Sequence, residues 1–219
     1  MIPQPFFTSV LDAIGHTPLV KLSRIVPENC ADIFVKLEYY NPTGSYKDRM
    51  ALSIVEAAEK RGDIVPGGTI VEFTGGSTGS SLAMICAVKG YRFIAVSSDA
   101  FAREKLQTIR LFGAQLEIEP SVNGTITPDL FDRMEARVLA HRQNGAYWPR
   151  QFYNTDAKIG YAEIGKEVIS QLDKPVDVFC AAVGTAGMFT GVSAVLKNQY
   201  PRLITYVLEP ESAPLLTKG

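Results

Sequence analysis

The sequence predicts an α/β protein in which parallel strands and flanking helices form three layers. Short segments rich in β-branched residues alternate with amphipathic segments of helical length through almost all of the 219 residues. Glycine-rich turns lie where several of the strands lead into helices. Strands separated by helices are typical of parallel sheets with right-handed crossovers. Hydrophobic residues make up 46% of the chain, enough for a sizeable core in one large domain or two modest ones.

The first part of the chain contains four predicted strand and helix pairs. Apolar residues recur at helical spacing in the first helix, and Gly62 follows its last basic residues as a C-cap. Gly90, Gly113 and Asn144-Gly145 close the three later helices in the same way. The predicted strands are 31–38, 69–73, 92–98 and 114–119. The predicted helices are 46–62, the segment from the turn at 75–79 to Lys89, 102–113 and 128–143.

The pattern then restarts. Helices are predicted at 156–172 and 188–199, and strands at 176–183 and 203–209. The run VDVFCAAV at 176–183 is short and β-rich, which is typical of a buried parallel strand. The stretches 120–128 and 144–153 are the best candidates for linkers, and the sequence has no internal repeat.

Composition and charge argue against several classes of function. The formal net charge is −1, without the clustered basic excess that nucleic-acid binding needs, so we expect a small molecule or another protein as partner. The three cysteines are far apart and form no C-x-x-C pair, so neither a disulfide framework nor a metal site is predicted. No signal peptide and no membrane span is recognisable, so the expected setting is reducing and cytoplasmic.

A lysine follows a shaped turn in the run Asn41 to Arg49 (NPTGSYKDR). Lys47 falls at the start of a predicted helix, where the positive partial charge disfavours the ammonium form. A neutral amine is the form that attacks a carbonyl, so Lys47 is a candidate nucleophile. The alternative interpretation is a solvated lysine that pairs with Asp48 at a helix start.

Two further loops follow strands and open helices. The run TGGSTG at 74–79 would let a ligand approach the backbone closely, although a tight structural turn explains it equally well. The run GTAGM at 184–188 could cradle a phosphate at a helix N-terminus. It lacks the spacing of a dinucleotide fingerprint and of a P-loop. Because ligands of open parallel sheets bind beyond the carboxyl ends of the strands, the three loops could form one site.

Taken together and in order, these motifs resemble the cysteine synthase and cystathionine β-synthase family of fold-type II enzymes that use pyridoxal phosphate (PLP). IGHTPL at 14–19 is similar to the family's N-terminal signature, and PTGSYKDR to its cofactor-lysine motif. TGGSTG stands where the family has T-S-G-N-T-G, and GTAGM where it has G-T-G-G-T. QFYN at 151–154 and Glu209-Pro210 also match, so the resemblance covers nearly the whole chain.

The resemblance implies roles for individual residues. Lys47 would carry PLP covalently and later move the Cα proton of the substrate. Ser77 lies where an asparagine contacts the ring hydroxyl. The residues that would bind the cofactor phosphate are Gly184, Thr185, Ala186, Gly187 and Met188. The residues that would surround the substrate carboxylate are Thr74, Gly75, Gly76, Thr78 and Gln151.

The resemblance also implies a fold and an assembly. The fold is that of the tryptophan synthase β-subunit, with a large PLP-binding domain formed by 1–38 and 149–219 and a small substrate-side domain formed by 39–148. A family member continues well beyond residue 219, so the large domain is expected to be incomplete. Members are usually homodimers that act on small amino acids.

The implied reaction is β-replacement on serine or an O-activated serine, as when cysteine synthase forms cysteine from O-acetylserine and sulfide. Three alternatives stay open. The first is PLP-dependent β-elimination, as in serine or threonine dehydratases and cysteine desulfhydrases. The second is a catalytically degenerate homologue that acts through a protein partner, because Gly75, Ser77, Ala186 and Met188 depart from the family motifs. The third is a hydrolase, since GGSTG fits G-x-S-x-G; only His141 could then serve as the base.

Overall fold

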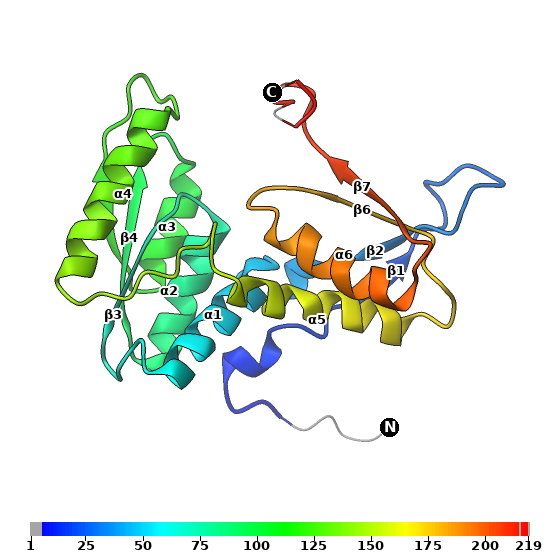
Figure 1. Cartoon of the computed structure of the whole chain (residues 1–219), viewed down its shortest axis with the longest axis horizontal. Coiled ribbons are helices and arrows are strands. Elements are labelled where there is room, and N and C mark those ends of the chain that lie inside the picture. The colour runs from blue at the N-terminus through cyan, green and yellow to red at the C-terminus, as the bar shows by residue number, and fades with distance from the viewer. Residues whose placement is uncertain (1–5, 215, 219) are drawn as a thin grey trace.

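A computed structural model describes residues 6–214 and 216–218 and confirms the α/β architecture (Figure 1). The N-terminal region and the loop before the first long helix each contain a short 3₁₀ helix, η1 and η2. The strands are β1 (Leu19–Lys21), β2 (Phe34–Lys36), β3 (Thr69–Phe73), β4 (Arg92–Ser98), β5 (Gln115–Glu119), β6 (Val178–Ala182) and β7 (Ile204–Leu208). The helices are η1 (Val10–Ala13), η2 (Glu38–Tyr40), α1 (Lys47–Arg61), α2 (Ser77–Lys89), α3 (Arg103–Leu111), α4 (Pro128–Gln143), α5 (Asp156–Gln171) and α6 (Gly187–Gln199).

The parallel sheet β3-β4-β5 is the centre of one three-layer sandwich. Side chains of a strand alternate between the two faces of a sheet, and the core follows that alternation. Ile70 of β3 packs into a cluster with α1, α2 and α3, whereas its neighbour Val71 packs into a cluster with α4 and Trp148. The apolar residues predicted for these segments therefore cover both faces of the sheet.

A second group of elements packs on the other side of α1. Figure 1 shows α5 and α6 side by side, with β6 and β7 along them and α1 between this group and the β3-β4-β5 sheet. Tyr161 of α5 is fully buried in the cluster that α1, α5 and α6 share. A Cβ at Gly160 would lie 2.3 Å from the carbonyl oxygen of Arg49, so only glycine lets α5 approach α1 this closely.

Most predicted elements are confirmed, and two expectations are wrong. Residues 31–38 form only the short strand β2, which pairs antiparallel with the unpredicted β1, so not every sheet is parallel. β6 is parallel to β7 as predicted, but it is not a buried strand. The side chain of Val178 at its start is 49% exposed, because α6 covers only one face of this two-stranded sheet.

None of the helices that the structure describes is both long enough and apolar enough to cross a membrane.

Candidate functional site

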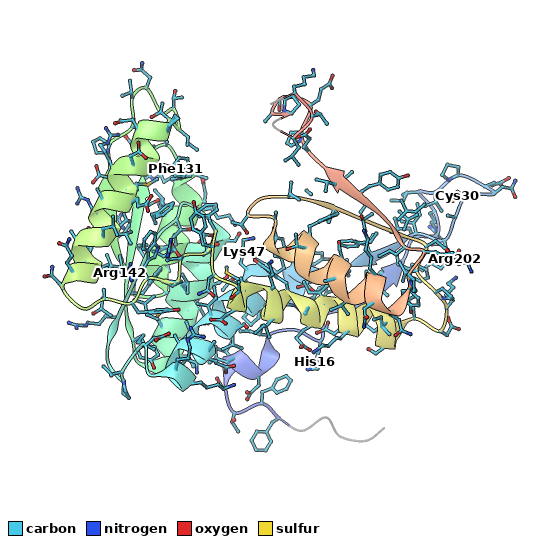
Figure 2. All side chains as sticks on the ribbon, viewed as in Figure 1. His16, Cys30, Lys47, Phe131, Arg142 and Arg202 are labelled. Carbon is cyan, nitrogen blue, oxygen red and sulfur yellow. The ribbon has the colours of Figure 1, made fainter. Side chains whose placement is uncertain are left out.

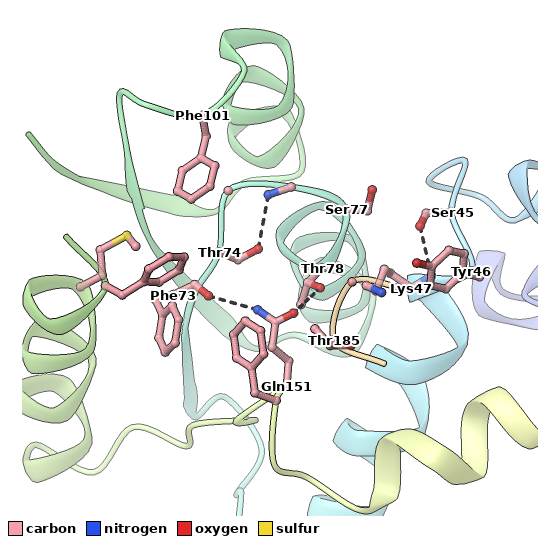
Figure 3. Close-up of a pocket in the computed structure, with 16 residues that line it drawn as sticks. Ser45, Tyr46, Lys47, Phe73, Thr74, Ser77, Thr78, Phe101, Gln151 and Thr185 are labelled. Atoms are coloured by element: carbon pink, nitrogen blue, oxygen red, sulfur yellow. Dashed lines mark hydrogen bonds between the residues drawn. The ribbon is translucent and has the colours of Figure 1, made fainter. Parts of the chain in front are cut away.

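The three loops singled out in the sequence converge on one pocket of about 450 Å³ (Figure 3). Lys47 at the start of α1, the segment 74–78 that runs from the end of β3 into the first turn of α2, and Gln151 line it. Gly184 and Thr185, which follow β6, complete the wall beside Lys47. Figure 2 shows Lys47 at the middle of the molecule, where the two groups of elements meet.

Lys47 is placed as a reactive amine. Its Nζ lies 4.2 Å from the centroid of the Tyr46 ring and 5.6 Å from that of Tyr161. Burial lowers the pKa of Lys47 to about 8. Among the described residues, no carboxylate lies within ion-pair distance of Nζ. A substantial fraction of the amine is therefore neutral near physiological pH, as attack on an aldehyde requires.

Asp48 anchors the lysine loop and does not pair with Lys47. The backbone N–H of Thr43 donates to Asp48 Oδ2 at 2.8 Å, and the hydroxyls of Thr43 and Ser81 donate to Oδ1. The Asp48 side chain is fully buried. Because Ser81 belongs to α2, this one carboxylate fixes the lysine loop against the helix that follows the 74–79 loop. The interpretation of Lys47 as a solvated partner of Asp48 is wrong.

The 74–79 loop presents hydroxyls and open backbone to the pocket. Thr78 Oγ1 donates to Gln151 Oε1 at 2.7 Å, and Gln151 Nε2 donates to the carbonyl of Phe73 at 3.2 Å. A Cβ added at Gly76 would meet no atom within 4 Å, so the space in front of this loop is open. The loop and Gln151 thus form one hydrogen-bonded wall.

The 184–188 loop contributes Gly184 and Thr185 to the pocket wall and leads into α6. Ala186 adopts a left-handed conformation with φ of 58°, and α6 begins at the next residue. The first N–H groups of a helix have no intrahelical acceptor and favour anions such as phosphate. Ala186, Gly187 and Met188 do not line the pocket, and the Met188 side chain packs into the α1–α5–α6 cluster.

These features together fit PLP. The cofactor needs a neutral amine for its aldehyde, anion-binding N–H groups for its phosphate and a space between them for its ring. Lys47 and the open region belong to the pocket, and the wall residues Gly184 and Thr185 lead into the start of α6. A Cβ at Gly184, like one at Gly76, would touch nothing within 4 Å, so both loops border free space. In the described part of the chain, no group of three or more His, Cys, Asp or Glu side chains could hold a metal ion.

The hydrolase interpretation finds no support in the geometry. His141 Nε2 of α4 lies 3.0 Å from Glu117 of β5, and it does not line the pocket that contains Ser77. No histidine is among the described residues that line this pocket. Ser77 therefore has no general base of that kind.

The pocket also has an aromatic part, and β3 carries a buried acid, neither of which the sequence motifs indicate. Phe73 and Phe152 directly follow or precede predicted site residues, so their adjacency could have identified them. Phe101 and Phe131 come from a loop after β4 and from α4, and no local motif marks them. Ser45, Tyr46 and Met134 also line the pocket.

Glu72 on β3 is the buried acid, with no exposed surface. Trp148 Nε1 donates to its Oε1 at 2.9 Å, and the backbone N–H of Gln151 donates to its Oε2 at 3.1 Å. Burial nevertheless raises the pKa of Glu72 to about 7, against the opposing effect of these donors. The carboxyl group thus joins β3 to the segment that carries Gln151 into the pocket.

This raised pKa predicts an unusual pH dependence of stability. Since the pKa of Glu72 rises from an ordinary 4.5 to about 7, the folded chain binds the extra proton and loses stability as pH increases between those values. Relative to Glu72→Gln, we expect the wild type to lose up to about 3 kcal/mol of unfolding free energy between pH 4.5 and 8. Urea titrations across this pH range measure the unfolding free energy of both proteins. Parallel curves for both proteins would contradict the prediction, and Glu135→Gln on the exposed face of α4 is the control.

The chain is similar to known enzymes that depend on PLP. The profile of the family described as "Pyridoxal-phosphate dependent enzyme" matches residues 10–219. A cysteine synthase of Staphylococcus aureus is 39% identical over 216 residues, which cover 96% of this chain and 67% of that protein. An O-ureido-L-serine synthase of Streptomyces lavendulae is 40% identical over 217 residues, covering 98% of this chain and 65% of that protein.

A solved structure is similar as well. The structure of a hydrogen sulfide-producing enzyme from Fusobacterium nucleatum superposes with a TM-score of 0.88 at 38% identity, covering 98% of this chain and 70% of that one. The chain therefore spans about two thirds of the length of the relatives that it matches.

Proposed function

Because this chain belongs to the family of pyridoxal-phosphate dependent enzymes, we propose that it catalyses β-replacement on serine or an O-activated serine. The observation that carries this proposal is the position of Lys47. Its partly neutral amine lies where three loops meet, without an anionic partner among the described residues. The names of the relatives, cysteine synthase and O-ureido-L-serine synthase, support replacement on a serine skeleton.

Each part of the pocket has a role in this proposal. Lys47 would hold the cofactor through its aldehyde, and the free amine of Lys47 would take the proton from the substrate Cα. The bound cofactor supplies an electron sink for the negative charge left on that carbon. The backbone N–H groups of 184–188 hold the phosphate, and Ser77 faces the ring hydroxyl. The substrate carboxylate is bound by Thr74, Gly75, Gly76, Thr78 and Gln151.

We further propose that the protein is a cytoplasmic homodimer that acts on small amino acids, with the two domains divided at 38–39 and 148–149. All three cysteines are free, and two of them are exposed, which fits a reducing compartment. Size-exclusion chromatography with light scattering measures the oligomeric state; a monomer at micromolar concentration would contradict the dimer.

Product analysis tests the reaction. The purified chain is loaded with PLP and given O-acetyl-L-serine with and without sulfide. We expect cysteine to be the main product when sulfide is present, measured by chromatography against pyruvate and ammonia. Pyruvate and ammonia at the same rate with or without sulfide would instead establish β-elimination, an activity that the hydrogen sulfide-producing relative makes worth testing. PLP-loaded chain that forms neither set of products would favour a degenerate homologue.

A further inference from the structure

We propose that the nucleophile which this pocket accepts is a thiol that carries an aromatic ring, and that Phe101 is a specificity-determining residue for it. The proposal rests on the function proposed above and names its second substrate. With O-acetyl-L-serine as the first substrate, the thiol sulfur forms the new bond to the substrate Cβ. The bond from Cβ to the acetate oxygen breaks, and its electron pair leaves on acetate. The thiol proton passes to solvent. The products are an S-aryl cysteine and acetate.

Four phenylalanines form one side of the pocket, which we call the aromatic wall: Phe73, Phe101, Phe131 and Phe152. The rings of Phe73 and Phe152 are stacked with centroids 5.8 Å apart, and Phe131 meets Phe73 edge to face at 6.2 Å. Phe131 is 37% exposed and Phe152 49% exposed. Two of these rings therefore line the pocket with much of their surface exposed, and they are not buried in the core behind Phe73.

Phe101 places the aromatic wall against the 74–79 loop, which would bind the substrate carboxylate. A Cβ at Gly75 would lie only 2.0 Å from Phe101 Cγ, so the ring occupies the space that a side chain at position 75 would need. Glycine at 75 and phenylalanine at 101 thus depend on each other. A serine at 75, as in the motif that this loop resembles, could not coexist with the ring where it lies.

The polarity of the pocket divides it into two ends. In Figure 3, Lys47 and Thr185 lie on one side of the 74–78 loop, and Phe73 and Phe101 lie on the other. Lys47 is the one charged side chain among the described residues that line the pocket. The end away from Lys47 offers ring faces and edges but no charge. Such a surface gains from burying an apolar ring and offers little to a small hydrosulfide ion.

Binding of two product analogues tests the proposal. S-phenyl-L-cysteine and S-methyl-L-cysteine share every polar group and differ in the ring. Calorimetry with the PLP-loaded chain should give a dissociation constant for the phenyl compound at least about tenfold lower. Trp148, the only tryptophan in the chain, lies 6.1 Å from the Phe73 ring, so its fluorescence should change on binding the phenyl compound.

Variants of the wall give the decisive comparison. Phe101→Leu and Gly75→Ser, which forces the ring away, should both reduce the preference for the phenyl compound to under about threefold. Phe152→Leu changes a half-exposed ring and should weaken the preference without a risk to folding. Phe189→Leu is the matched control, because that ring stacks on Phe179 and does not line the pocket, so the preference should stay.

Three results would overturn the proposal: equal affinity of the wild type for both compounds, a full preference in Phe101→Leu and Phe152→Leu, or an equal loss in Phe189→Leu. Failure of the wider function is recognised separately. If the chain takes up PLP on Lys47 and makes cysteine from sulfide, yet binds both compounds equally, the proposal of an aromatic thiol fails and the proposal of β-replacement stands. If PLP never attaches to Lys47, both proposals fail.

Discussion

Replacement of Lys47 by alanine will remove all covalent attachment of PLP and lower turnover by about 10³-fold or more. The amine serves both as the bond to the cofactor aldehyde and as the base at Cα, and proton transfer by a positioned side chain alone contributes about 10²- to 10⁴-fold. Lys47→Arg should fail equally, because a guanidinium stays charged and cannot attack a carbonyl. Positive charge at this position is therefore not sufficient.

Borohydride reduction followed by peptide mass spectrometry measures the attachment. The wild type should carry one phosphopyridoxyl group on the peptide that contains Lys47. Labelling should increase as pH rises through about 8, because the amine loses its proton over that range. Lys166→Ala is the control, since that lysine is exposed on α5 and pairs with Glu163. Persistent labelling of Lys47→Ala at another lysine would refute the assignment.

The loops of this pocket could be singled out from the sequence because they carry strong local signals. Helices end where glycine follows them, as at Gly62 and Gly90, which both adopt the left-handed conformation in the structure. β3 and β4 have the predicted bounds, since each is a short apolar run between turns. That these loops meet in one pocket could not be derived from the strands alone, because β3 and β6 belong to different sheets.

What could not be predicted depends on contacts between distant segments. Phe101 reaches the pocket only because Gly75, 26 positions earlier, leaves it room. In the sequence, Glu72 looks like an ordinary charged residue within a strand. Only the fold shows that Trp148 and Gln151 donate hydrogen bonds to its carboxyl group. The antiparallel β1–β2 pair could not be predicted, because three-residue strands carry almost no periodic pattern.

The largest effect on stability is expected at Arg49, on α1 two residues after Lys47. Its side chain is 4% exposed and donates to two carboxylates, to Glu38 Oε2 at 2.8 Å and to Glu167 Oε1 at 2.6 Å. Lys36 donates to the second oxygen of Glu167 at 2.6 Å. Burial by itself would raise the pKa of Glu167, but Arg49 and Lys36 hold it at about 2. This network ties α1 to η2 and α5.

Arg49→Met should therefore destabilise the folded chain by about 3–5 kcal/mol, because two partly buried carboxylates would be left around a single lysine. Arg61→Met is the matched control on the same helix. Arg61 also pairs with two acids, Asp63 and Asp156, but its side chain is 46% exposed, so its loss should cost far less than the loss of Arg49. Urea unfolding at pH 7 measures both, and equal midpoints for the two variants would show that the Arg49 network adds nothing special.

The pH dependence separates this electrostatic effect from lost packing. Because the pKa of Glu167 lies near 2 in the folded chain and at an ordinary 4.5 when unpaired, its stabilisation is complete above about pH 4.5 and declines as pH falls toward 2. The difference in unfolding free energy between the wild type and Arg49→Met should accordingly narrow between pH 5 and pH 3. If burial of the aliphatic part of Arg49 were the main contribution, the difference would stay constant over that range, because packing does not titrate.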